Sequence, residues 1–304
     1  MASIRDLRKR ITTVKNTQQT TKAMKMVSAA KLRRSQEAIF NNRPFAWSIS
    51  RLIRLISMIP EAEIETPLIA GPGYVEKPLN EKRIVLVAIT SDRGLCGGFN
   101  SNINKATLAL YRKLKNEAKS VELVFIGRKA SEFYKARGVT KPLYYSEVGA
   151  KATFDKAHQL SQFLIDYFLS GKCDEVQIVY NEFKNAISQK ITNERFLPVS
   201  RAEAVPSEKN SQPIENAELY IVKPGPKAVM ETLLKKYFAT QAFRILLESQ
   251  ASEHGARMGA MENATKNAGE MIKKLTLQYN KQRQAGITKE LLEIISGSES
   301  QKSA

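Results

Sequence analysis

The stretch MGAMENATKNAGEMIKKLTLQYNKQ, residues 258–282, places small and apolar side chains at alternating steps of three and four residues. Such spacing keeps one face of an α-helix against a partner helix for more than three heptads, as in a coiled coil. No proline occurs between residues 227 and 296. We therefore expect one C-terminal helix over 227–297, roughly 100 Å long at 1.5 Å per residue, and a short tail over 298–304. The positions on its seam are Met258, Met261, Thr265, Ala268, Ile272, Leu275, Tyr279 and Gln282.

The N-terminal residues 1–59 provide a natural partner for that helix. They contain no glycine and a single proline, Pro44. The polar residues Gln18 and Thr21 stand where the N-terminal seam calls for apolar side chains, so the seam buries little apolar area per residue. We expect a slender antiparallel coiled coil. The apolar part of the N-terminal seam follows the same steps of three and four: Ile4, Leu7, Ile11 and Val14.

Between the two helices, residues 82–200 alternate strand and helix patterns, which is typical of an α/β domain with a mostly parallel sheet. A further strand over 189–199 follows the last of these closely, so we expect an antiparallel edge. The fold class predicted is α/β, with an antiparallel coiled coil of long N- and C-terminal helices and an inserted Rossmann-like α/β domain. A linker is expected over 60–81, and a loop and foot segment over 201–226. The expected strands are 83–90, 121–127, 142–148 and 175–183, and the expected helices are 101–117, 128–137 and 152–170.

Charge and composition restrict the class of partner. The chain has a formal net charge of +18, and residues 1–60 alone carry 13 Lys or Arg against two acids. A basic helix implies an acidic partner surface, which can be nucleic acid, anionic lipid or protein. There is no apolar run long enough to cross a bilayer and no secretory signal pattern at the start, so we expect a soluble, cytoplasmic protein. Cys96 and Cys173 are expected to be reduced.

The glycine-rich turn SDRGLCGGFN, residues 91–100, lies between an expected strand and an expected helix, where phosphate sites occur. It lacks both the GxGxxG spacing and a following GK[ST]. The sequence therefore favours a tight turn without phosphate. Cys96 has no triad partner, because His158 and His254 lie on expected helices. We predict no catalytic residues, no cofactor and no metal. A thiol enzyme centred on Cys96 is a remote alternative.

Three segments resemble the gamma subunits of F-type ATP synthases, in which terminal helices form the central rotor shaft. They are IRDLRKRITTVKNTQQTTKAMKMVSAAKLRRSQ at 4–36, TSDRGLCGGFN at 90–100 and QYNKQRQAGITKELLEIISG at 278–297. The resemblance implies a non-catalytic subunit that transmits rotation between a proton-driven membrane ring and three catalytic sites. It further implies ATP synthesis and proton transport, at the cytoplasmic face of the cell inner membrane. The alternative from charge alone is a basic coiled-coil protein that binds nucleic acid.

Partners and contact residues follow from the same resemblance. The implied partners are the alpha and beta subunits of the catalytic head, the epsilon subunit and the membrane c-ring, with no nucleic acid. Met24 and Lys25 match shaft positions near the moving lever of the catalytic subunits, although many family members carry glutamate in place of Lys25. Arg257 resembles the shaft arginine that faces an acidic lever. A polar catch near the end of the shaft is implied for Arg283, Gln284, Thr288, Glu290 and Glu293.

Two departures from the family pattern limit what is carried over. The segment YNEFKNAISQKIT, residues 180–192, runs through without the cysteine pair of plant chloroplast gamma subunits, so thiol regulation is not expected. The foot segment ELYIVKPGPKAVMETLL, residues 218–234, lacks the acidic residue that often precedes its first proline. Contact between residues 219–226 and the membrane ring is therefore left open.

Overall fold

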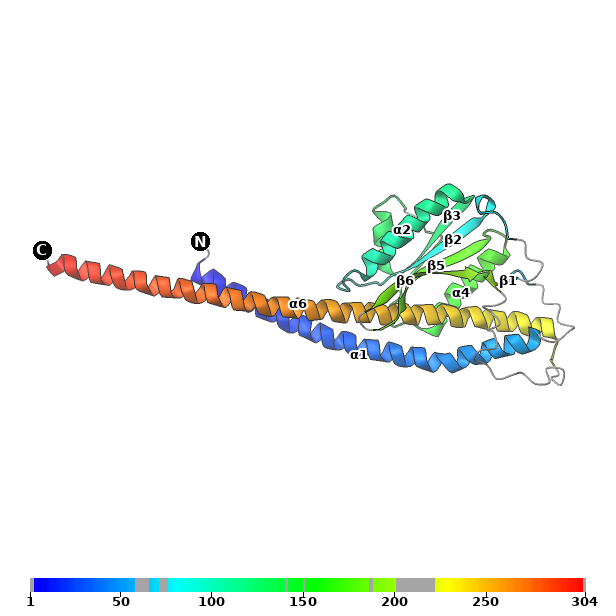
Figure 1. Cartoon of the computed structure of the whole chain (residues 1–304), viewed down its shortest axis with the longest axis horizontal. Coiled ribbons are helices and arrows are strands. Elements are labelled where there is room, and N and C mark those ends of the chain that lie inside the picture. The colour runs from blue at the N-terminus through cyan, green and yellow to red at the C-terminus, as the bar shows by residue number, and fades with distance from the viewer. Residues whose placement is uncertain are drawn as a thin grey trace. The chain divides into compact units, whose positions relative to one another are not determined.

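The computed structural model describes residues 3–57, 66–70, 76–139, 142–149, 151–185, 188–200 and 222–302. It divides into two compact units, a coiled-coil unit of residues 1–28 and 257–304 and an α/β unit of residues 29–256. Two long helices, α1 (Ile4–Ser57) and α6 (Pro226–Lys302), contribute to both units (Figure 1). Helix α6 continues to Lys302, where the sequence analysis expected a tail.

A five-stranded sheet forms the centre of the α/β unit, in the order β4-β3-β2-β5-β6. The first four strands in space are parallel, and β6 runs antiparallel to β5 at the edge. The central strand is apolar on both faces, as expected where helices cover both sides of a sheet. This confirms the predicted fold class. The strands are β2 (Arg83–Ile89), β3 (Ser120–Ile126), β4 (Tyr144–Ser146), β5 (Glu175–Phe183) and β6 (Gln189–Leu197).

Helices cover the sheet on two sides and create two apolar cores. Helix α2 (Phe99–Glu117) and α3 (Arg128–Lys135) pack on one face. Helix α4 (Phe154–Leu169) packs on the other, with parts of α1 and α6 that belong to the same unit. Figure 1 shows α2 and α4 on opposite sides of the sheet. The larger core, on the α4 side, is what attaches the long helices to the sheet.

A second, two-stranded sheet was not predicted. Strand β1 (Ile69–Ala70), inside the range expected to be linker, pairs in parallel with β7 (Val199–Ser200), at the end of the range expected to be the α/β domain. The short 3-10 helix η1 (Leu79–Glu81) follows in the same range. Two residues are too few to show any hydrophobic period, so sequence patterns cannot reveal such a strand.

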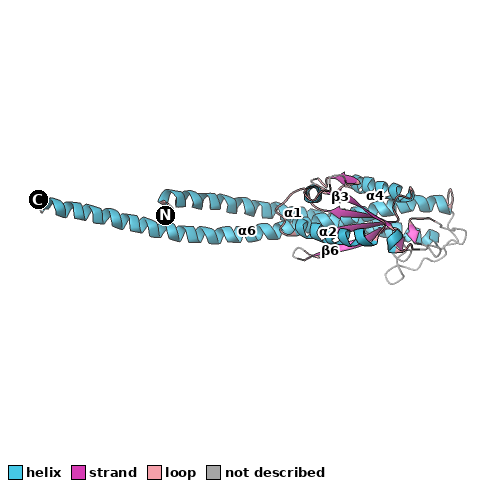
Figure 2. Cartoon of the chain, turned by 90° about the horizontal axis from the view of Figure 1, so that it is seen from above, coloured by secondary structure: helices cyan, strands magenta, loops and turns pink. Residues whose placement is uncertain are grey.

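In the coiled-coil unit, the predicted seam residues are at least partly buried, except Ile4, which is 38% exposed. Met261 and Ala268 are buried on α6 and Leu7 is buried on α1, while most of their neighbours are exposed. A Cβ added at Gly286 would lie 3.8 Å from Cδ1 of Ile4, so the pairing reaches the start of α1. Figure 2 shows α6 extending beyond that point. No helix among the described residues has a stretch long and apolar enough to span a membrane.

Candidate partner-binding surfaces

The glycine-rich loop after β2 is held by its own side chains. Backbone N–H of Ser91 donates to Oδ1 of Asn100 at 3.0 Å, and the Ser91 hydroxyl donates to the carbonyl of Arg93 at 2.6 Å. Gly97 has a φ of 56°, and Leu95 also has a positive φ, 62°. The loop is thus a tight turn that needs glycine at position 97.

Cys96 is a structural thiol in this turn. Its side chain is buried, and its sulfur accepts a hydrogen bond from Nδ2 of Asn100 at 3.2 Å. Cys173 is buried as well, and burial raises its pKa to about 12. His158 stacks against Phe154 on α4. No cluster of metal-ligating side chains occurs in the part of the chain that the structure describes.

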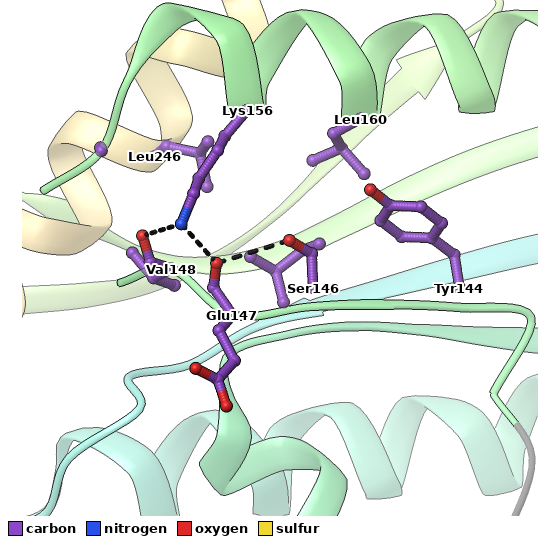
Figure 3. Close-up of a pocket in the computed structure, with 9 residues that line it drawn as sticks. Tyr144, Ser146, Glu147, Val148, Lys156, Leu160 and Leu246 are labelled. Carbon is purple, nitrogen blue, oxygen red and sulfur yellow. Dashed lines mark hydrogen bonds between the residues drawn. The ribbon is translucent and has the colours of Figure 1, made fainter. Parts of the chain in front are cut away.

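A pocket between β4, α4 and α6 is too small to be a ligand site (Figure 3). Its volume is about 10 Å³, roughly the space of one water molecule. The ammonium of Lys156 points to its centre and donates to the carbonyls of Glu147 and Val148, each at 2.9 Å. The lysine therefore connects the first turn of α4 to the residues directly after β4, which is a structural role.

The coiled-coil unit contains a polar seam and an open cleft beside it. The hydroxyls of Thr21 and Thr265 lie 2.8 Å apart, and Nε2 of Gln18 donates to the carbonyl of Thr265 at 3.4 Å. The cleft has a volume of about 630 Å³ and lies along the same helices. Its charged lining consists of Lys22, Lys25, Lys266 and Glu262.

Lys25 and Met24, predicted to contact a partner, are both partly exposed in this unit. The ammonium of Lys25 lies 2.6 Å from Oε1 of Glu262, so its first partner is within the chain. With side chains 38% and 58% exposed, this ion pair contributes only a few tenths of a kcal/mol. It can exchange for a partner contact at little cost. Arg257, in contrast, is 8% exposed and has little surface to offer.

The five residues predicted for the polar catch are all exposed on the last part of α6. The hydroxyl of Thr288 donates to the carbonyl of Gln284 at 2.9 Å. Glu293 lies 3.5 Å from the ammonium of Lys289, one helical turn away. These are ordinary surface contacts of a helix. The side chains of Arg283 and Glu290 are exposed on the same part of α6.

An apolar stripe on the same end was missed by the sequence analysis. Ile287, Leu291, Ile294 and Ile295 are 48–68% exposed. Their spacing of i, i+4, i+7 and i+8 places them on one face of the helix. The signal that could have predicted this stripe is the spacing itself, which can be read directly from the sequence. A contiguous exposed apolar face indicates a protein partner.

Comparison with known proteins agrees with this architecture. The family model described as ATP synthase matches residues 3–300. An ATP synthase gamma chain of Bdellovibrio bacteriovorus is 44% identical over 302 residues, covering 99% of this chain and all of that one. One from Geobacter sp. strain M21 is 43% identical with the same coverage.

Solved structures give the same result. The central stalk and c-ring structure of the Tetrahymena thermophila mitochondrial ATP synthase contains a chain that is 28% identical, with a TM-score of 0.59, covering 81% of this chain and 99% of that one. A chain of the Euglena gracilis mitochondrial ATP synthase, 22% identical, has a TM-score of 0.62 and shows the same fold over 98% of this chain. With a family model and relatives that span its full length, the chain belongs to the ATP synthase gamma chain family.

Proposed function

We propose that this chain is the rotating central shaft of an ATP synthase, with its coiled-coil unit inside a ring of alpha and beta subunits. The gamma chain is a non-catalytic subunit of the ATP synthase, and it forms the central stalk. The Tetrahymena structure of the central stalk and c-ring supports a c-ring as a partner of this chain. We assign the α/β unit to contacts with that ring and with the epsilon subunit. None of the relatives described above is named as a nucleic-acid-binding protein, so that alternative has no support.

The observation that carries the proposal is the exposed end of α6. Gly286 lies beside Ile4, the first residue of α1. Beyond Gly286, helix α6 continues to Lys302 with its apolar stripe exposed. Exposed Ile and Leu at this density need a partner that covers them. A ring of subunits around the end of the helix would cover this stripe from outside.

The proposed coupling follows from the asymmetry of one shaft among three equivalent catalytic sites. A single shaft cannot make the same contacts with three equivalent catalytic sites, so each site is biased toward a different conformation. Each bias equals the difference in contact free energy between the site's conformations. Turning the shaft moves the biases from site to site, which couples proton flow to ATP synthesis, and hydrolysis to reverse rotation.

The polar seam suits such a shaft. Thr21, Thr265 and Gln18 satisfy one another's hydrogen bonds within the pair of helices. The outer surface beside them is basic, with three lysines along the cleft. A surface of this kind fits many angular positions about equally well. A deeply apolar, shape-matched surface would favour one angle over the others.

We assign the contact residues accordingly. Met24 and Lys25 face the moving lever of the catalytic subunits, where Lys25 exchanges Glu262 for an acidic partner. Arg257, which is mostly buried, is assigned to the part of the shaft that faces the same lever. The end of α6 contacts the ring through its apolar stripe and through the polar residues Arg283, Gln284, Thr288, Glu290 and Glu293.

The complex to which the chain belongs is membrane-associated, and we place the chain peripherally at the cytoplasmic face of the inner membrane. We propose that the foot segment, residues 219–226, contacts the c-ring, and residues 222–226 are its described part. Residues 219–221 lie outside the described residues.

The test is reconstitution of the ATPase. Purified alpha and beta subunits of the same organism are mixed with and without the full chain, and ATP hydrolysis is followed over time. We expect sustained hydrolysis only with the chain present. In this assay Lys25→Gln changes the rate, whereas Lys135→Gln, on the α/β unit, serves as a control with the same charge change.

The opposite result would be a folded chain that neither assembles with alpha and beta nor alters turnover. Salt-dependent binding to DNA by that same chain would then favour the nucleic-acid alternative. Loss of a separate turnover in Cys96→Ala would favour the thiol enzyme.

A further inference from the structure

Within the α/β unit, helix α6 is attached to the sheet by two kinds of contact. Ile245 and Leu246 of α6 belong to the larger apolar core. The hydrophobic effect is non-directional, so it holds α6 on the sheet without itself fixing how the helix is rotated about its own axis. The second kind of contact is polar and directional. The hydroxyl of Ser252 donates to the backbone carbonyl of Asn181 at 3.1 Å, and Arg244 contacts side chains of β5 and β6.

The guanidinium of Arg244 bonds two strands of the sheet at once. Its Nη1 donates to the hydroxyl of Tyr180 on β5 at 3.2 Å, and its Nη2 donates to Oε1 of Glu194 on β6 at 2.5 Å. The Tyr180 hydroxyl in turn donates to Oε2 of Glu194 at 2.8 Å. Burial raises the pKa of Tyr180, so its hydroxyl stays protonated and remains a donor. The three side chains thus form a closed ring of hydrogen bonds, the Arg244 ring, in which each group restricts the other two.

Two further side chains of α6 orient the arginine toward this ring. The Nε of Arg244 donates to Oε1 of Gln241 at 2.8 Å, and its Nη1 donates to Oε1 of Glu248 at 3.3 Å. Gln241 and Glu248 lie about one helical turn before and after Arg244, so they restrict its side chain from within the same helix. The side chain of Arg244 is 30% exposed. The guanidinium is therefore held by α6 on one side and by the sheet on the other.

The distance of this group from the axis of α6 makes the Arg244 ring sensitive to rotation of the helix. A side-chain group lies roughly 6 Å from the axis, so turning the helix by about 10° moves the group by about 1 Å. A displacement of that size is enough to break the hydrogen bonds to Tyr180 and Glu194, because such bonds weaken steeply beyond about 3.2 Å. Arginine–carboxylate contacts are also strong, and the planar fork of the guanidinium fixes their direction. The Arg244 ring therefore opposes rotation of α6 against the sheet.

We propose that Arg244 is the positioning residue that fixes the rotation of α6 on the sheet, and that it thereby transmits torque between them. The inference rests on the proposed function of the chain as a shaft, and it names the residue through which the sheet turns together with α6. Under load, the Arg244 ring keeps the helix and the sheet in one register. Without the ring, α6 turns within its apolar contacts, because packed helices slide past one another by small movements.

The test is the ratio of proton pumping to ATP hydrolysis by the complete ATP synthase, assembled with each variant in liposomes and measured on the same vesicles. Arg244→Met removes the guanidinium and keeps an unbranched side chain. With a protonophore present, no gradient opposes rotation, and we expect hydrolysis close to that of the natural chain. Without it, pumping per ATP should fall severalfold as the gradient builds. Arg244→Lys keeps the charge without the fork and should lose less. Arg112→Met, exposed on α2, is the control and should pump as the natural chain does.

A purely structural role of Arg244 gives a different pattern. Hydrolysis and pumping then fall together, in proportion to the amount of folded and assembled chain, and this result would overturn the proposal. A natural ratio at every gradient in an assembled Arg244→Met complex would overturn it as well. If that variant does not assemble, Glu194→Gln, which removes the charge on the strand and keeps the shape of the side chain, decides between the same outcomes. Absence of both activities with the natural chain would contradict the shaft itself, and with it this inference.

Discussion

Gly127, directly after β3, occupies a position that no other residue can take. Its φ is 99°, and a Cβ added there would lie 2.2 Å from the backbone oxygen of Thr90. We expect Gly127→Ala to destabilise the chain by about 3 kcal/mol or more, because both strain and a collision with fixed backbone contribute. Gly138 has a φ of 86° but nothing within 4 Å of its added Cβ.

Gly138→Ala is therefore the matched control, and it should cost only the backbone strain, about 1–2 kcal/mol. Urea unfolding of the two variants measures the difference. If they lose the same stability, the contact with Thr90 relaxes at no cost and the interpretation is wrong.

The lowered pKa of Asp174 lets us predict how the free energy of unfolding changes at acid pH. Asp174 accepts hydrogen bonds from the backbone N–H and the guanidinium of Arg83, at 2.9–3.1 Å, and from Lys77 at 2.8 Å. The Arg83 contacts, followed by Lys77, hold the pKa of Asp174 well below its usual value of 3.8. A depressed pKa stabilises the fold at pH values above 3.8, and this contribution is lost as the pH falls further.

Asp174→Asn should therefore cost about 2 kcal/mol at pH 7 and should flatten the pH dependence of stability below about pH 4. Denaturant midpoints at pH 7, 4 and 3 measure both effects. The exposed Glu117→Gln is the control and should leave the profile unchanged. An unchanged slope in Asp174→Asn would mean that other carboxylates dominate acid unfolding.

Residues of this kind mark the limit of sequence reasoning. Asp174 lies 91 positions from Arg83, and no local period connects them. The same holds for Asn181, whose burial depends on the hairpin and on α2. The seam residues Met261 and Ala268, in contrast, were predicted correctly, because a helix period is a local property of the chain.

At the scale of elements, the polar seam of the coiled coil can be tested by its threonines. Replacing Thr21 alone by Val leaves the Thr265 hydroxyl without its partner at 2.8 Å, and we expect a loss of about 0.5–1 kcal/mol. Replacing both by Val removes two polar groups together, and we expect a neutral or stabilising effect.

Hydrogen exchange of backbone amides in residues 14–25 measures local opening of this part of α1. The double-mutant cycle should show a coupling of at least about 0.5 kcal/mol between the two threonines. Additive effects within error would show that the hydroxyls act separately, as each can bond the backbone of its own helix. Thr265 does so through the carbonyl of Met261 at 2.7 Å.

The larger elements were predictable for a physical reason. Strand β2 is a short run of apolar residues with turn residues after it, and the strands that follow alternate with helices of ordinary length. Element ends were less certain: α2 begins at Phe99, two residues before the expected start, because the N–H of Asn102 already donates to the carbonyl of Gly98 at 2.9 Å. The pair β1 and β7 forms only through contact between distant segments.

At the scale of the whole molecule, shortening the chain tests the role of the exposed helix end. Removing residues 283–304 deletes the apolar stripe and the polar residues beside it, but leaves the paired seam up to Gln282. We expect the α/β unit to stay folded, because its cores use none of these residues. Sustained hydrolysis in the reconstituted ATPase should fall severalfold, as the end loses its contacts with the ring.

A second variant separates the effect of the length of α6 from the effect of its apolar side chains. Replacing Ile287, Leu291, Ile294 and Ile295 by Gln keeps the helix and removes its apolar stripe. If this variant behaves like the natural chain while the truncated one fails, length matters and the stripe does not. Undiminished hydrolysis by the truncated chain would contradict the assigned contacts altogether.

The burial of both native thiols has a practical consequence for optical work on this chain. Cys96 is 2% exposed and Cys173 is 4% exposed, so neither offers a reactive thiolate to reagents in solution. A cysteine introduced at Leu277, which is 71% exposed, should react with a maleimide dye far faster than either. The natural sequence thus needs no prior removal of cysteines, and a single fluorophore on the helix can report its orientation during turnover.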